Sequence, residues 1–436
     1  HSNWRFIDEK GTGFSVPVGG HIEVNSPTAA VRAAASGLGV AQVPAFIARI
    51  AQDNVRGAAR EILTANPLGG MCSRVCPTEV LCEQACVRNT QEDKPVEIGA
   101  LQRYATDAFM ASGGAPLFQR AAATGRKVAV VGAGPAGLTC AHQLALQGHE
   151  VVLFDARPKL GGLNEYGLAS YKTPGDFAQK EIDWLLSVGG ITPRNNQRLG
   201  RDFTLDSLLA EHDAVFLGLG LAGVNALGAA EPQAEGLRNA VDFIADIRQA
   251  ADKSTVPVGR RVVVIGGGMT AVDASVQARL LGADEVTMFY RRGKDALSAS
   301  WVEQEWAQTH GVNLRLWAAP QEILVQDGKV CGVRMACTRM EGDRLQVTQE
   351  VFDVPADMVL KAIGQTYVAT PAGAAIALRD GRIDTDDEGR TSVPRVWAGG
   401  DCRAGGQDLT VQAVEHGKVA ARAMHQALTS AVAAGV

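Results

Sequence analysis

The 436-residue chain contains no run of 18 or more uncharged apolar residues, so we expect no membrane span. Its N-terminal stretch has no apolar core of a signal peptide. Neither sign of charge dominates, because 42 Lys and Arg face 47 Asp and Glu, for a net charge of −5. This balance excludes the basic footprint of a nucleic-acid-binding protein. We therefore expect a cytoplasmic protein that binds neither nucleic acid nor a membrane.

Cysteine is scarce, with eight in the whole chain and none before Cys72. Four of them are dispersed, which argues against a secreted disulfide scaffold: Cys140, Cys331, Cys337 and Cys402. The other four lie within fifteen residues: Cys72, Cys76, Cys82 and Cys86. Thiols at this density favour an iron–sulfur site, and the alternatives are zinc or unligated reduced thiols. The two glycine-rich units described next contain no C-x2-C or C-x4-C, so a disulfide reductase is disfavoured.

The strongest motif starts with the apolar run 127–131, which predicts a buried parallel strand. A G-x-G-x-x-G loop and a helical pattern over 138–147 follow it, and a second apolar run ends in Asp155. This combination predicts a dinucleotide site, with the pyrophosphate at the helix N-terminus and Asp155 on a ribose hydroxyl. The alternative is a glycine-rich turn before an ordinary helix. The first candidate residues for FAD are Gly132, Gly134, Pro135, Ala136, Gly137 and Asp155.

The same unit recurs 134 residues later in the form G-x-G-x-x-A. Its second strand ends in Arg291 and Arg292, where the first copy has Asp155. Guanidinium groups bind a 2′-phosphate, which favours NADP over NAD; the alternative is a solvated arginine pair. A later strand ends at Gly364. The candidate residues for NADPH or NADH are Gly266, Gly268, Met269, Thr270, Ala271, Arg291, Arg292 and Gly364.

Three further segments complete the first site. Paired glycines at 161–162 suit a loop that crosses a flat cofactor, and a strand at 395–401 ends in Gly-Gly-Asp before a closing helix over 409–428. The first N–H groups of that helix are expected to face the flavin or its phosphates. For Asp401 the alternative is a helix cap. These segments add Gly162, Leu163, Gly400, Asp401, Thr410 and Val411 to the FAD candidates.

Helical periodicity at 43–63 and 97–111, after a mostly irregular arm at 1–35, predicts a mainly helical N-terminal domain of iron–sulfur type. Two Rossmann-like domains of an α/β protein follow it, and residues 314–354 alternate as antiparallel strands within the second. The expected domains are 1–120 (helical), 126–240 with 366–436 (FAD) and 241–365 (NAD(P)).

These motifs resemble the glutamate synthase small-subunit family of flavoproteins, and most closely the electron-input subunit of bacterial dihydropyrimidine dehydrogenase. The resemblance covers about residues 43 to 428 and rests on seven segments: 74–87, 98–106, 160–163, 262–273, 290–292, 362–365 and 398–401. It implies an NAD(P)H-oxidising FAD subunit in a hetero-oligomer, which passes electrons through iron–sulfur clusters to a catalytic partner subunit. In dihydropyrimidine dehydrogenase that partner is an FMN barrel, which reduces uracil or thymine.

The chain departs from the family at its thiols. The family carries two four-cysteine groups for two [4Fe–4S] clusters, and the first group should lie before residue 43, where this chain has none. By resemblance, Cys86 serves one cluster, whereas Cys76, Cys82 and Gln102 serve the other. Either the four thiols rearrange around one [4Fe–4S] cluster, with Gln102 as a further candidate ligand, or no cluster forms.

Two other functions stay open at this point. One is a glutamate synthase small subunit that feeds an amidotransferase partner. The other is a non-catalytic or cluster-free accessory subunit of a larger redox complex. No catalytic side chain is named, because hydride transfer between two cofactors needs alignment rather than a protein acid or base.

Overall fold

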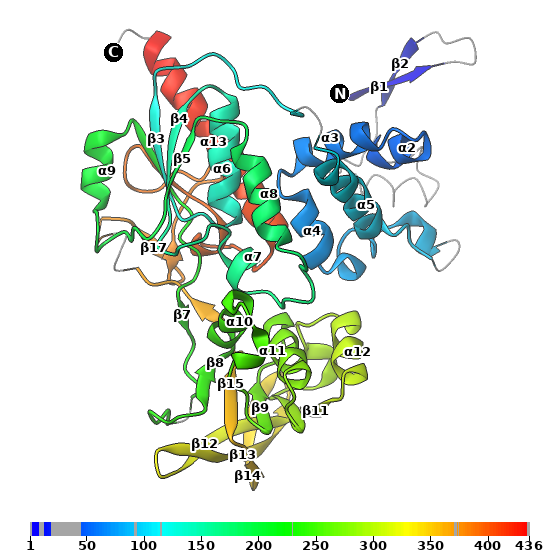
Figure 1. Ribbon diagram of the computed structural model, residues 1–436, viewed down its shortest axis with the longest axis vertical. Coiled ribbons are helices and arrows are strands. Elements are labelled where there is room, and N and C mark those ends of the chain that lie inside the picture. The colour runs from blue at the N-terminus through cyan, green and yellow to red at the C-terminus, as the bar shows by residue number, and fades with distance from the viewer. Residues whose placement is uncertain are drawn as a thin grey trace.

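The structure is a computed structural model that describes residues 2–7, 13–18, 45–90, 94–113, 116–228, 230–369, 373 and 375–433. Figure 1 shows a group of N-terminal helices beside a first α/β unit, with a second α/β unit below both. No helix within these described ranges is both long and apolar enough to cross a bilayer. The predicted fold class is confirmed, since two parallel sheets follow a helical N-terminal part.

The first sheet has five parallel strands in the order β19-β6-β3-β4-β5. Its central strands are short apolar runs because helices cover both of their faces. The strands are β3 (Lys127–Val131), β4 (Glu150–Phe154), β5 (Ile191–Arg194), β6 (Ala214–Leu217) and β19 (Val396–Ala398). Its helices are α6 (Pro135–Leu146), α7 (Leu163–Tyr166), α8 (Phe177–Leu186), α9 (Leu205–Glu211) and α13 (Thr410–Ala433).

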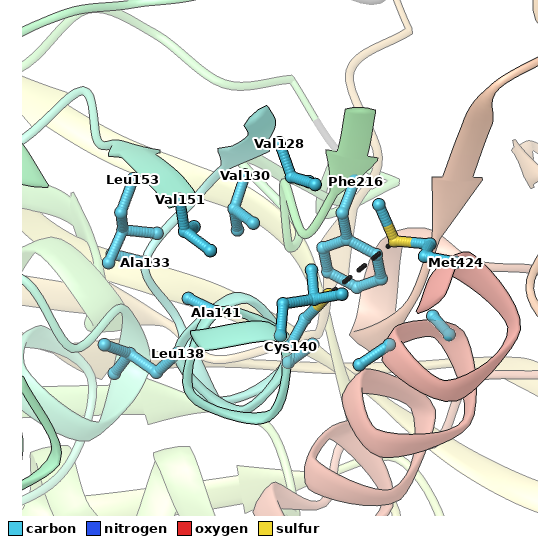
Figure 2. Close-up of a cluster of buried hydrophobic side chains, with 14 of the residues drawn as sticks. Val128, Val130, Ala133, Leu138, Cys140, Ala141, Val151, Leu153, Phe216 and Met424 are labelled. Carbon is cyan, nitrogen blue, oxygen red and sulfur yellow. Dashed lines mark hydrogen bonds between the residues drawn. The ribbon is translucent and has the colours of Figure 1, made fainter. Parts of the chain in front are cut away.

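The core of this unit lies where α6 and α13 pack together against the sheet (Figure 2). Phe216 of β6 is fully buried there, and the sulfurs of Cys140 and Met424 lie 4.0 Å apart. The two helices approach closely at Gly417, where an added Cβ would lie 2.4 Å from the carbonyl oxygen of Ala136. This contact fixes α13 directly over the start of α6.

The second sheet is also parallel, in the order β11-β10-β9-β15-β8. An antiparallel sheet in the order β12-β13-β14 extends from it, which confirms the antiparallel excursion predicted from the alternating pattern. The strands are β8 (Leu237–Asn239), β9 (Arg261–Ile265), β10 (Glu285–Tyr290), β11 (Val312–Leu316), β12 (Ala318–Gln326), β13 (Lys329–Glu341), β14 (Arg344–Pro355) and β15 (Met358–Lys361). The helices are α10 (Ala240–Gln249), α11 (Met269–Leu280) and α12 (Trp301–Thr309).

Two chain crossings join the two sheets. The outgoing segment forms β7 (Gly223–Val224) and the returning segment forms β16 (Gln365–Thr366), and these pair antiparallel. A further small pair, β17 (Leu378–Arg379) and β18 (Arg382–Ile383), precedes β19. The second unit is therefore an insertion between the fourth and fifth strands of the first sheet in chain order.

The N-terminal part contains the helices predicted from periodicity. They are α2 (Ala45–Ala51), α3 (Val55–Ala65) and α5 (Ile98–Ala111). A further helix, α4 (Gly69–Val75), lies between the two predicted stretches. The expectation of a mostly irregular arm was wrong in two places, because β1 (Ser2–Ile7) and β2 (Gly13–Val18) pair as an antiparallel hairpin. Trp4 and Phe6 alternate with polar residues, which is typical of a strand, and the surrounding glycines obscured that pattern. The remainder of that arm lies outside the described residues.

A buried carboxylate joins the helical part to the first sheet unit. Glu181 of α8 is fully buried and accepts hydrogen bonds from the backbone N–H groups of Gly70 (2.7 Å) and Met71 (3.2 Å) in the first turn of α4. Burial raises the pKa of Glu181 from 4.5 to about 8. The neutral form is therefore favoured in the folded protein over a wide pH range.

This raised pKa predicts a loss of stability with rising pH. Between pH 4.5 and 8 the folded state retains the Glu181 proton that the unfolded state has lost, so its contribution falls by at most about 1.4 kcal/mol per pH unit. We expect Glu181→Gln, which cannot ionise, to remove this part of the dependence. Urea unfolding at pH 5 and pH 8 measures it, with Glu211→Gln on the exposed side of α9 as the control. An equal decline in wild type and Glu181→Gln would contradict the assignment.

Candidate functional site: a cavity between two glycine loops

One continuous cavity of about 1490 Å³ reaches both glycine loops. Its walls come from the carboxyl ends of the two parallel sheets, where open α/β folds bind their ligands. The predicted residues that line it are Gly132, Gly134, Pro135, Ala136, Asp155, Gly162, Leu163, Gly400, Asp401 and Thr410 in the first unit, and Gly266, Gly268, Met269, Thr270, Arg291, Arg292 and Gly364 in the second. The two predicted sites therefore open into the same space.

The three glycines of the first loop have different surroundings. Gly132 has φ +95°, and a Cβ there would lie 2.2 Å from the carbonyl oxygen of Gly218. Gly137 does not line the cavity but lies buried beneath the loop, where a Cβ would meet the carbonyl oxygen of Gly132 at 1.8 Å. A Cβ on Gly134 would meet nothing closer than 3.9 Å, so its lack of a side chain leaves space in the cavity instead. Of these three glycines, only Gly134 has open space where a side chain would stand.

Asp155 stands at the end of β4 and is tied to the glycine loop. Its carboxylate accepts hydrogen bonds from the N–H groups of Ala133 and Arg157, each at 2.8 Å. Burial raises its pKa, although these hydrogen bonds and the Arg157 charge oppose the shift. Each oxygen of the Asp155 carboxylate can accept a second hydrogen bond. Because Asp155 lines the cavity, a ribose hydroxyl bound there could donate it.

The segment from Gly400 to the start of α13 also contributes to the first site. Burial and the neighbouring Asp408 raise the pKa of Asp401 to about 7. Asp401 lies nine residues before α13 begins at Thr410, so it is not the cap of that helix. The Thr410 hydroxyl donates to the side-chain oxygen of Asn164 at 3.0 Å, which connects α13 to α7 across the cavity. Val411 does not line the cavity, and its side chain is exposed.

The second loop follows β9 in the same geometry as the first follows β3. A Cβ on Gly266 would lie 2.1 Å from the carbonyl oxygen of Ala362, so β15 packs directly against the turn. Gly268 precedes α11 in an extended conformation, and Met269 and Thr270 form the helix start within the cavity wall. Ala271 is fully buried and supports the helix rather than lining the cavity.

Arg291 and Arg292 lie at the end of β10 and both line the cavity. Two hydrogen bonds hold the backbone of this pair. The Arg291 carbonyl accepts one from the Thr338 hydroxyl at 2.8 Å, and the Arg292 carbonyl accepts one from the N–H of Trp317 at 3.4 Å. The backbone is therefore fixed where a 2′-phosphate of a nucleotide on the second loop would lie.

A buried ionic cluster connects the two units beside the cavity. Lys172, from the first unit, forms ion pairs with Asp273 of α11 (2.7 Å) and Glu303 of α12 (2.8 Å). Asp273 is almost fully buried and also accepts from the N–H of Ala169 at 2.9 Å. Sequence patterns miss this cluster, because Lys172 lies more than 100 residues from both acids. A signal that the sequence does offer is an acid, Asp273, between small apolar residues in a predicted helix.

The four clustered thiols do not gather into one ligand shell. Cys76 lines the cavity, whereas Cys72 is buried and the Cys86 sulfur accepts from the N–H of Val96 at 3.3 Å. Gln102 and Cys82 do not line the cavity. Among the described residues, which include all four thiols, no three Cys, His, Asp or Glu side chains are placed to hold a metal ion. The residues thus fit two dinucleotides, whereas the four thiols are not gathered into one ligand set in this structure.

Comparisons with known proteins agree with the two-nucleotide geometry. Residues 126–417 match the family model of pyridine nucleotide-disulphide oxidoreductases. Residues 38–114, which include the four thiols, match the model of dihydropyrimidine dehydrogenase domain II, 4Fe-4S cluster.

Two curated relatives from Escherichia coli cover most of the chain. The small chain of NADPH glutamate synthase is 36% identical over 82% of this chain and 80% of its own length. The NAD-dependent dihydropyrimidine dehydrogenase subunit PreT is 33% identical over 88% of each chain. In three other relatives the match spans only 58–63% of a longer protein. The resemblance inferred from the motifs is thereby confirmed.

A solved structure supports the fold independently. FprA from Mycobacterium tuberculosis, in complex with NADPH, superposes with a TM-score of 0.61 over 71% of this chain and 86% of its own, at 19% identity. With two nucleotide loops on one cavity, a matching family model over residues 126–417 and relatives above 30% identity, this chain belongs to the pyridine nucleotide-disulphide oxidoreductase family, as an NAD(P)H-dependent FAD oxidoreductase related to glutamate synthase small chains and PreT.

Proposed function

We propose that this chain is an electron-input subunit, which oxidises NAD(P)H at the second glycine loop, reduces FAD at the first and delivers the electrons to a partner oxidoreductase. The observation that carries the proposal is the shared cavity, since hydride transfer requires the two cofactor rings to meet. The flavin supplies the chemistry by taking two electrons as hydride and releasing them to an acceptor. A partner is expected because both E. coli relatives are named as parts of larger enzymes.

The residues of this chain bind and orient the cofactors. In the first unit, the N-terminus of α6 and Gly134 would hold the pyrophosphate, and Asp155 a ribose hydroxyl. In the second unit, the N-terminus of α11 would take the other pyrophosphate, and the arginine pair a 2′-phosphate. The cluster of Lys172, Asp273 and Glu303 holds the two units in register so that the rings meet.

The same proposal assigns the domains. Residues from β3 to the β7 crossing, with those from β16 onward, would form the FAD unit, and the segment between the crossings the NAD(P) unit. In support, β8 at 237–239 pairs with β15 of the second sheet. We therefore propose the first boundary at the β7 crossing, before residue 240, and the return at β16, near residue 365.

Anaerobic titration of the purified, FAD-loaded protein with NADPH and then NADH tests the proposal. We expect the visible flavin absorption to bleach on addition of reduced nucleotide and to return when an electron acceptor is added. Bleaching without an electron paramagnetic resonance signal is expected if no cluster forms. A flavin that neither nucleotide reduces would overturn the proposal and favour an accessory subunit without catalysis.

A further inference from the structure

Trp317 has a backbone conformation that is unusual for so large a residue. Its φ is +60°, in the left-handed region, where a bulky side chain is an outlier. Apart from Arg395, the other non-glycine residues with positive φ in the described part of the chain are Asp or Asn, which adopt it more readily. Trp317 lies where the chain leaves β11 and enters β12. Since a glycine would make this turn without strain, the large side chain points to a function of its own.

The indole ring of Trp317 is held in place by its neighbours. A Cβ on Gly293 would lie 2.7 Å from the Cζ2 atom of the indole, so the ring packs against the backbone directly after the arginine pair. The N–H of Trp317 donates to the carbonyl of Arg292 at 3.4 Å, and its carbonyl accepts from the N–H of Thr338 at 2.8 Å. Trp317 nevertheless remains 38% exposed. The ring is therefore positioned from one side and accessible from another.

The order of the strands places Trp317 on the line that a bound dinucleotide would follow. The strand before the second glycine loop, β9, pairs with β10, which ends before the arginine pair, and β10 pairs with β11. The last residues of β10 and β11, Tyr290 and Leu316, are partners, so Arg291 and Trp317 follow side by side. Pyrophosphate, ribose and adenine succeed one another in the same order in the nucleotide. With the pyrophosphate at the loop and the 2′-phosphate at the arginines, the adenine extends toward β11.

The cavity reaches this end of the sheet, because Arg292 and residues 318–320 line it, although Trp317 itself does not. We propose that the indole of Trp317 is a stacking platform, at the rim of the cavity, for the adenine base of NADPH and NADH. Stacking on an aromatic ring stabilises a bound base through its flat face. The strained backbone then has a role, which is to place the ring beside the nucleotide. The inference rests on the proposed function, since it takes NAD(P)H as the nucleotide of the second loop.

Trp317→Ala is expected to raise KM for NADPH and NADH by the same factor, about 5- to 150-fold, with kcat unchanged. Both nucleotides carry the adenine, and its contact lies far from the hydride, so it contributes equally to the ground state and the transition state. Reduced nicotinamide mononucleotide, which has no adenosine, should react with the variant as it does with wild type. Steady-state rates of the FAD-loaded protein with an artificial acceptor measure all three substrates.

Binding of adenosine 2′,5′-bisphosphate to the oxidised, FAD-loaded protein gives a second readout that needs no turnover. Calorimetry should show the same fold loss of affinity in Trp317→Ala, and Trp317→Phe should recover most of it because a phenyl ring also stacks. Trp317→Gly, which adopts a positive φ freely, should lose affinity as well and replaces the alanine variant if that protein is unstable. Tyr104→Ala, which removes an exposed ring from α5, is the control and should bind like wild type.

Unchanged affinity for the bisphosphate in both Trp317→Ala and Trp317→Gly would overturn the platform. A loss confined to NADPH would also overturn it, since that result indicates a contact with the 2′-phosphate. An equal loss with the mononucleotide would overturn it as well, by indicating a general disturbance of the fold. If neither nucleotide reduces the flavin, but bisphosphate binding still depends on Trp317, the proposed function is wrong and the platform is upheld.

Discussion

Gly134→Ala is expected to leave the protein folded and to weaken FAD binding by roughly 5- to 150-fold. The added methyl group meets no protein atom closer than 3.9 Å, so the apoprotein has room for it. It would occupy the place where the pyrophosphate approaches the loop backbone, and overpacking of this kind costs about 1–3 kcal/mol. Flavin retention after gel filtration and a fluorescence titration with FAD measure the change, while circular dichroism and thermal unfolding of the apoprotein check the fold.

Gly137→Ala is the matched comparison, three residues away in the same motif. Its methyl group would lie 1.8 Å from the carbonyl oxygen of Gly132, so this variant should destabilise the apoprotein itself. The two alanines therefore separate a glycine that serves the ligand from one that serves the fold. If Gly134→Ala bound FAD as tightly as wild type, the pyrophosphate would not lie at this loop.

The second large effect concerns the choice of nucleotide. Replacing Arg291 and Arg292 together by alanine is expected to lower kcat/KM for NADPH on the order of 10- to 100-fold, with little change for NADH. Each charge-assisted hydrogen bond to a 2′-phosphate contributes about 1.5–3 kcal/mol, and NADH lacks that group. Both residues line the cavity with their backbone held by Thr338 and Trp317.

Steady-state rates with both nucleotides and an artificial acceptor measure this preference. Arg344→Ala, on the exposed strand β14, removes one positive charge away from the cavity and should change neither rate. The salt dependence adds a second readout, because the NADPH advantage of wild type should shrink as ionic strength rises. Equal losses for NADPH and NADH would contradict a 2′-phosphate contact and indicate a general role in binding or folding.

Local sequence patterns predicted those parts of the site whose residues lie close together in the sequence. Strand, glycine loop and helix are contiguous, so the positions of Gly132 and Gly266 followed from spacing alone, and so did the acid and the arginines at the strand ends. The antiparallel excursion was visible as alternation. These features depend on backbone chemistry within about thirty residues, which a sequence displays directly.

Features that depend on long-range packing were not predictable. The buried contact between Glu181 and α4 joins residues 111 positions apart, and the Lys172 cluster spans 131. Nothing in the local sequence distinguishes these carboxylates from solvated ones. The spacing of the four cysteines suggested one shared ligand set, but Pro77 follows Cys76 immediately, α4 ends there, and only Cys76 reaches the cavity.

The insertion of the second sheet within the first has a consequence for biosynthesis. The ribosome makes β3 to β6 early, but β19, the turn after it with Gly400 and Asp401, and α13 with Thr410 emerge only after the whole inserted unit. The nascent chain therefore carries an incomplete flavin pocket through most of its synthesis, and the prosthetic group can be captured only near the end of translation. A premature stop shortly before β19 would leave a complete second sheet in a polypeptide unable to retain flavin.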